Sequence, residues 1–229
     1  MNPIGQVARR GVAVLALVGA IGREGRADVR VWDGGGADAL ASNPLNWDGD
    51  TSPPATGDDI LLDATSRRNL TWDLGGVTVG NWIQTADYTG RVTICTVYPG
   101  RGAFTNFAIA GNCMITNGTW THQQNSNDTA VAAFRLKATI GGNLYLGAAA
   151  MIDVDYIGYR GEGRGPGKGY TNKRSASHGG QGDGMYDNFT DDGITYGSIT
   201  EPVDLGSSAR LNVGGGGGAS AGAGAANGG

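Results

Sequence analysis

Apolar and polar residues alternate in three short runs within residues 134–159. Gly141 and Gly142 separate the first run from the second, and Gly147 with three alanines separates the second from the third. Alternation with a period of two predicts a strand that buries one face, and glycines allow tight turns between such strands. The pattern therefore predicts three strands whose inward side chains are Ile140, Leu144, Leu146, Ile152 and Val154.

Similar apolar runs recur between residues 60 and 121, at intervals of about 18–22 residues, a length that suits one coil of a solenoid. A chain that turns after every few residues and keeps one face apolar is typical of stacked coils. We therefore expect an all-β protein, a right-handed parallel β-helix, with parallel strands from residue 60 to residue 157. The expected core contributors upstream are Ile60, Leu61, Leu62, Leu70, Trp72, Val77, Val79, Trp82, Val92, Ile94, Phe104, Phe107, Ile109, Met114 and Ile115.

Composition agrees with this architecture. Hydrophobic residues make up 39% of the 229 positions, and 43 positions are glycine. Glycine averages about 7% in globular proteins, so this chain is rich in turn formers and poor in long aliphatic runs. Such a composition favours strands and turns over a helical bundle.

The N-terminus has the pattern of a secretory signal peptide. Two arginines precede an apolar run over residues 11–22, which is too short to cross a membrane as a helix. Small residues at Gly25 and Ala27 predict cleavage before Asp28. The alternative is a buried first helix. We expect residues 1–27 to be removed and the protein to be secreted or displayed on a bacterial cell surface, without a transmembrane span.

Cleavage at this site makes the mature chain acidic. It leaves 13 Lys and Arg against 20 Asp and Glu, a formal charge of −7. A polyanionic partner such as nucleic acid is therefore disfavoured.

The two cysteines matter because an exported chain enters an oxidising compartment. The spacing between Cys95 and Cys113 is close to the expected length of one coil. Two interpretations stay open, a disulfide between stacked coils and a pair of buried free thiols.

A distinctive block follows the predicted cleavage site. Trp32 and Asp33 precede three glycines, and the block continues through Asn46–Trp47, Pro53–Pro54 and Gly57–Asp58–Asp59. This order resembles the opening module of bacterial secreted β-helix and autotransporter-type passenger proteins. The likeness extends through residues 69–73 and 88–94, and it implies an architecture rather than an activity.

The resemblance also implies a domain plan. Residues 28–59 are expected to form an N-terminal capping module, and residues 60–159 the rungs. In such a module Trp32 and Trp47 would cover the open end of the solenoid, which otherwise exposes its apolar section. The alternative for these two aromatic rings is a platform that binds sugar rings.

The composition changes after Tyr159. Residues 160–205 resemble a Gly-rich insertion between two rungs, and residues 206–229 a further rung with a Gly/Ala-rich tail. We expect residues 160–193 and 214–229 to be the least ordered parts, and the chain to be a piece of a longer passenger.

Asp153 and Asp155 are the best candidates for catalysis. At positions i and i+2 of a strand, their side chains would project from one face about 7 Å apart, a separation that inverting glycosidases use. No arginine or histidine lies near them in the sequence, and a solvated strand face is the alternative. His122 and His178 are too few for a zinc site or a triad, so no metal or cofactor is expected.

Together these patterns favour a non-enzymatic passenger with an adhesive or structural role, whose partner is a surface polysaccharide or a host or matrix surface. The alternative is a carbohydrate-active β-helix, either a polysaccharide lyase or a glycoside hydrolase. A cluster of carboxylates with Arg or Lys on one exposed face would favour the enzyme. A face lined with Thr, Asn and Gly would favour the scaffold. Ice binding is disfavoured because no Thr-x-Thr motif repeats, and the oligomeric state is left open.

Overall fold

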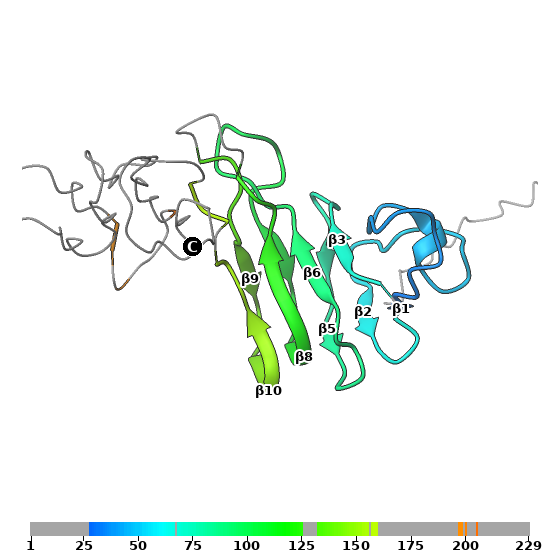
Figure 1. The fold of residues 1–229 in the computed structure, drawn as a ribbon. Helices are drawn as coiled ribbons and strands as arrows, with labels where there is room; N and C mark the ends of the chain where they lie inside the picture. The colour runs from blue at the N-terminus through cyan, green and yellow to red at the C-terminus, as the bar shows by residue number, and fades with distance from the viewer. Residues whose placement is uncertain are drawn as a thin grey trace, which may run out of the picture.

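The protein is a parallel β-solenoid of about four turns. The computed structural model describes residues 28–66, 68–125, 132–155 and 157–159, and the single positions 197, 198, 200 and 205. The strands lie side by side along one axis, from β1 at one end to β9 and β10 at the other (Figure 1). Every strand pairing within the sheets of the described chain is parallel, so the expected all-β class and the stacked parallel architecture are confirmed.

The chain visits three sides of the solenoid in turn. Two sides belong to one sheet of seven strands, and the third is a sheet of three strands. One short 3-10 helix, η1, precedes the first full coil. The elements are β1 (Val29–Val31), η1 (Pro44–Asn46), β2 (Asp59–Leu62), β3 (Leu70–Trp72), β4 (Thr78–Val79), β5 (Trp82–Gln84), β6 (Arg91–Ile94), β7 (Phe107–Ile109), β8 (Cys113–His122), β9 (Ala138–Ile140) and β10 (Leu144–Ile152).

Most coils are longer than the sequence spacing predicts. Ile60 of β2 pairs with Trp82 of β5, Trp82 pairs with Cys113 of β8, and Cys113 pairs with Leu144 of β10. Hydrogen bonds at the corner before these strands join positions 22 residues apart in the first step and 31 residues apart in the next two. The expected interval of about 18–22 residues therefore holds for one coil only, because later coils add residues in the turns, where periodicity leaves no signal.

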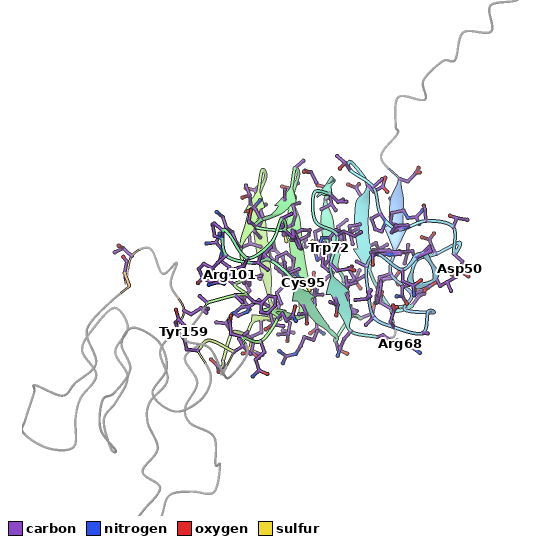
Figure 2. All side chains as sticks on the ribbon, turned by 90° about the horizontal axis from the view of Figure 1, so that it is seen from above. Asp50, Arg68, Trp72, Cys95, Arg101 and Tyr159 are labelled. Carbon is purple, nitrogen blue, oxygen red and sulfur yellow. The ribbon has the colours of Figure 1, made fainter. Side chains whose placement is uncertain are left out.

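Aromatic rings fill the interior. Trp32, Trp47, Trp72, Trp82, Phe107 and Trp120 form a continuous series of ring contacts, with centroids 5.0–6.3 Å apart. Most contacts are edge-to-face, the arrangement that the ring quadrupoles favour. Trp72 lies in the middle of the stack in the view from above (Figure 2). Because the ring contacts run from coil to coil, the core holds the coils together as one body.

One polar side chain sits within this aromatic core. Gln84 of β5 is fully buried, and its Oε1 accepts hydrogen bonds from Nε1 of Trp82 at 2.9 Å and from Nε1 of Trp120. Its Nε2 donates to the carbonyl of Asn117 at 3.0 Å. Gln84 thus satisfies two indole donors that would otherwise be buried without a partner.

A ladder of side chains runs along one corner of the solenoid. Oδ1 of Asp59 accepts from the backbone N–H of Asn81, Oδ1 of Asn81 accepts from Asn112, and Oδ1 of Asn112 accepts from Asn143. We call these four residues the corner ladder. The glycine before each asparagine leaves room for it, since a Cβ at Gly142 would lie 2.5 Å from Oδ1 of Asn112.

The N-terminal end of the stack is closed. β1 pairs with β2, so strand pairing begins well before the expected start at residue 60. On the other edge of β1, Val31 donates to Oδ1 of Asp48 and accepts from the N–H of Asp48. Both backbone groups of Val31 that face away from β2 are therefore satisfied. Asp50 and Arg68 lie at this end of the molecule, and Tyr159 lies at the opposite end (Figure 2).

The C-terminal coil differs from the prediction in burial. Leu144 and Leu146 align with the buried Cys113 and Ile115, and Ile152 aligns with the buried Trp120, so the inward orientation is as predicted. Yet Leu144, Leu146 and Ile152 are 48%, 44% and 43% exposed, and Ile140 and Val154 are only half-buried. The expected burial of Leu144, Leu146 and Ile152 was wrong, because the described chain places no coil above them, whereas Ile140 is partly buried and packs against the core.

The predicted division of this region into three strands was also wrong. β9 is followed by one nine-residue strand, β10, whose pairing with β8 shifts register between Leu146 and Ala149. At this bulge a Cβ on Gly147 would lie 2.3 Å from the carbonyl oxygen of Thr116. Gly147 therefore serves a close approach of two backbones within a continuous strand.

Several predictions fall outside the described residues. They are the signal peptide over residues 1–27, nearly all of the Gly-rich insertion over residues 160–205, and the further rung and tail over residues 206–229.

Candidate functional site

Asp153 and Asp155 lie just beyond the end of β10, not on a strand. The backbone N–H of Asp155 donates to Oδ1 of Asp153 at 3.0 Å, which is an Asx turn. The predicted geometry, two carboxylates projecting from one strand face, was therefore wrong. Asp side chains often end a strand in this way, by accepting a hydrogen bond from the backbone N–H two residues later.

The structure brings a cation to Asp153 that the sequence did not reveal. Nη2 of Arg91 lies 3.3 Å from Oδ2 of Asp153, although 62 residues separate the two. Their side chains are 47% and 23% exposed. The register explains the meeting, because Arg91 of β6 pairs with Thr119 of β8, and Thr119 pairs with Met151 of β10. Alternation in the sequence places Arg91 on the outward face of its strand. It does not show which residue lies beside Arg91 on the following coils, because that depends on the number of residues in each coil.

Both oxygens of Asp153 are thus engaged, Oδ1 by the turn and Oδ2 by Arg91. A general acid or base must be able to exchange its proton with a substrate, and a carboxylate held in a turn and an ion pair is poorly placed to do so. Chemically, the Arg91–Asp153 pair is suited to fastening the last described coil to the coil two turns below it.

Trp32 and Trp47 are fully buried. Their rings contact each other edge-to-face at 5.2 Å, and their indole nitrogens donate to the carbonyls of Arg68 and Ala41. Neither ring offers a face to solvent, so a sugar cannot stack on either in this structure. Large rings among turn residues resemble an exposed platform in sequence, and only the packing of the loop over them decides otherwise.

The two cysteines are free thiols in the structure. Cys113 starts β8 on one side of the solenoid, whereas Cys95 follows β6 on another side, so they do not stack. The disulfide interpretation relied on a coil as short as the spacing between the two cysteines, which the actual coils exceed. Burial raises the pKa of Cys113 to about 12, and burial together with the charge of Asp73 raises the pKa of Cys95 to about 11.

His122 is almost fully buried and faces the interior, where it pairs in register with Ile94. Its Nδ1–H donates to the carbonyl of Gln123 at 2.7 Å, and burial lowers its pKa below 6.5. Across the part of the chain that the structure describes, no group of three or more His, Cys, Asp or Glu side chains could hold a metal ion. His178 lies outside the described residues.

The outer surface offers a different candidate. One outward side chain per coil aligns in the pairing register of β1, β2, β5, β8 and β10, and all five are apolar. We call this set the outer column: Val31, Leu61, Ile83, Met114 and Tyr145. With strands about 4.8 Å apart, the column is about 19 Å long. Exposure increases toward the C-terminal end, where Met114 is 39% and Tyr145 is 55% exposed.

The outer column is unusual for a solvent-facing sheet. Alternation normally places polar residues outward, whereas here each coil repeats an apolar one. The corner ladder borders it, so an apolar stripe lies beside a polar rim, as at many binding surfaces. The expectation that Leu61 and Met114 belong to the core was wrong, because each lies between two buried residues of its strand and therefore faces outward.

The other sides carry shorter and more polar columns. Thr71, Thr93 and Thr121 align on one side, and Thr78, Ala108 and Thr139 on the next. Thr121 is buried, with 4% exposure, so this threonine column does not form a flat exposed array. A repeating Thr-x-Thr motif would place two threonine columns side by side on one face, and the described strands do not have this arrangement.

The comparisons with known proteins leave the chain without an assigned family. No family model, no curated protein and no solved structure matches it. Within the described residues, none of the helical structure has the length and apolar character needed to cross a membrane.

Proposed function

We propose that this chain is a secreted or cell-surface β-solenoid that acts without catalysis, as an adhesive or structural element. Its partner is a surface polysaccharide or a host or matrix surface. The observation that carries the proposal is the outer column, a row of apolar side chains repeated once per coil. A rigid row with a fixed repeat binds an extended partner through many weak contacts at once.

The placement of the candidate catalytic residues supports the same proposal. Catalysis on sugars needs a pair of carboxylates with separated pKa values, or a base beside a cation, free to meet the substrate. Asp153 is instead committed to a turn and to Arg91. In the outer column, the exposed ring of Tyr145 takes the role of sugar platform that Trp32 and Trp47 cannot fill.

Binding to a panel of insoluble polysaccharides and matrix proteins tests the proposal. The full chain is incubated with each material, and the bound fraction is measured after sedimentation. Tyr145→Ala should weaken binding by about three- to tenfold, as expected for the loss of one ring contact. Thr139→Ala, at an exposed position on another side of the solenoid, is the matched control and should bind as the parent does. Equal losses for both variants, or no binding to any material, would count against the proposal.

A carbohydrate-active enzyme is the second candidate, and one observation favours it. Arg91 supplies the cation beside Asp153 that the sequence did not place there. The soluble panel members are therefore also monitored for new reducing ends and unsaturated products. Turnover that Asp153→Asn abolishes, with unchanged folding, would replace the adhesive role by a lyase or hydrolase.

A further inference from the structure

Charge is distributed unevenly along the solenoid. Residues 28–87, which hold β1 to β5, contain 10 Asp against 3 Arg, a formal charge of −7. Residues 88–152 contain four Arg and Lys side chains against one Asp, a formal charge of +3. Arg101 lies toward the end of the molecule that carries Tyr159, away from Asp50 and Arg68 (Figure 2). The negative total charge of the mature chain therefore conceals a local excess of cations.

Three of these four cations lie on two chain segments that run side by side, residues 96–101 and residues 133–137. The segments are antiparallel, and backbone hydrogen bonds flank the bridge between Val97 and Phe134 on both sides. The fully buried hydroxyl of Thr96 donates to one carbonyl of the second segment and accepts from one of its N–H groups at 3.1 Å. The backbone that carries the cations is therefore held in place by the protein itself.

The three cationic side chains belong to the outer surface of this pairing. Leu136 packs against the core, so the residues on either side of it, Arg135 and Lys137, face outward. The guanidinium of Arg135 lies over the ring of Tyr98, with 4.7 Å between its carbon and the ring centroid. Arg101 is exposed, and its N–H donates to the carbonyl of Tyr98 at 3.0 Å, which closes a turn. We call Arg101, Arg135 and Lys137 the basic patch.

The basic patch is not neutralised by the described chain. The ion pair that the described residues form joins Arg91 to Asp153, and no carboxylate pairs with a member of the patch. The Nε of Arg135 is also buried without a hydrogen-bond partner among the described residues. Because the Tyr98 ring fixes the plane of the guanidinium, its two terminal amino groups are oriented in advance. Two parallel N–H groups in one plane fit the two oxygens of a carboxylate.

The charge of the remaining chain limits the kind of anion. Duplex nucleic acid carries one charge per about 1.7 Å and would also meet the acidic N-terminal coils, which repel it. A polysaccharide with one carboxylate per sugar has a lower charge density, and its carboxylates recur at a spacing that separate cations can match.

We propose that the basic patch binds a carboxylate-bearing polysaccharide. Arg135 holds one carboxylate through two hydrogen bonds, and Lys137 and Arg101 contact neighbouring carboxylates of the same polymer. The patch is separate from the outer column, so this inference goes beyond the proposed function and can fail or succeed independently of it.

Calorimetric titration of the full chain with polygalacturonate at low ionic strength tests the site. Arg135→Gln should weaken binding by at least about tenfold, as expected for the loss of hydrogen bonds to a charged group. Arg135→Lys keeps the charge but not the planar fork, so it should bind more weakly than the parent and more tightly than Arg135→Gln. Lys137→Gln, at an exposed position without a side-chain contact in the described chain, should also weaken binding without affecting folding. Arg30→Gln removes the same charge from β1 and is the matched control, which should bind as the parent does.

Binding should weaken as the salt concentration rises, and the uncharged polymer dextran should not bind. No binding of polygalacturonate, or equal losses for Arg30→Gln and Arg135→Gln, would overturn the proposal. Tighter binding of dextran sulfate or of duplex DNA would replace carboxylate recognition by a response to charge density, and an Arg135→Lys variant equal to the parent would do the same. Binding that the patch variants leave unchanged would assign the site to other cations, such as the five in residues 160–174. A loss caused by Tyr145→Ala alone would assign it to the outer column.

Discussion

Gln84 provides the sharpest test of how the core is held together. It is fully buried, and its one carbonyl oxygen accepts from both Trp82 and Trp120. Gln84→Met keeps nearly the same length and volume but removes the acceptor. The two indole N–H groups then stay buried without a partner, and the carbonyl of Asn117 loses its donor.

The expected loss of stability follows from these contacts. Leaving a buried donor unsatisfied costs about 1–3 kcal/mol, so two indole donors predict a loss of about 2–6 kcal/mol. A domain has a total stability of only about 5–15 kcal/mol, so the effect should be large. Leu62→Met is the matched control, because Leu62 is fully buried and pairs in register with Gln84. A volume-conserving apolar exchange of this kind should cost less than about 1.5 kcal/mol.

Urea denaturation followed by far-UV circular dichroism measures both variants against the parent. The denaturant slope m must agree among the three proteins, since a changed slope would mean that the compared states differ. A free energy of unfolding for Gln84→Met within about 0.5 kcal/mol of that for Leu62→Met, at equal slope, would refute the reasoning. It would mean that the core repacks or that water reaches the indole groups.

The remaining predictions concern the corner ladder, the ion pair, the buried histidine and a thiol. Asn112→Ala should lower the free energy of unfolding by about 1 kcal/mol in urea titrations, and Asn112→Asp, which retains the acceptor, should recover most of the loss. Asp153→Asn should lower the free energy of unfolding by no more than about 1 kcal/mol, because the ion pair with Arg91 is partly exposed. This loss should become smaller in 1 M salt, which screens the pair. A loss of stability that salt does not change would indicate that the turn at Asp153 is responsible instead. Burial lowers the pKa of His122 below 6.5 in the folded state, so the unfolded state binds the proton first. Stability should therefore fall as the pH drops below about 6.5, and His122→Gln should remove this dependence in thermal melts between about pH 5 and 7. Burial raises the pKa of Cys113 to about 12, so its reaction with a thiol reagent at pH 8 should be on the order of 1000-fold slower in the folded chain than in denaturant; fast labelling of the folded chain would contradict the buried placement.

Much of the fold was predictable because strand alternation is a local property. Leu70 and Trp72, and likewise Val92 and Ile94, are separated by one residue, so their side chains must share a face, and both pairs are buried as expected. The paired glycines at residues 141 and 142 correctly marked a turn. Parallel stacking followed because many short runs with one apolar face can bury that face only by lying on one another.

Burial itself was not a local property. Leu144 and Leu146 have the inward parity that alternation predicts, but exposure depends on whether a coil lies above them. Trp32 and Trp47 show the converse case, since turn residues surround them in sequence while the folded loop and Trp72 enclose them.

The contacts at the candidate site depend on the number of residues in each coil, and the lengths of the turns set this number. Turns can lengthen without changing the alternation of the strands, so a coil of 22 residues followed by one of 31 residues leaves no trace in the pattern. The sequence alone therefore determined which alternate side chains of a strand share a face, although within the apolar runs at Leu61 and Met114 it did not show which face is the inner one. Only the tertiary structure decided that Arg91 meets Asp153, that Cys95 and Cys113 lie apart, and that five outward apolar residues fall into one column, because each of these depends on which coil positions the turns bring into register.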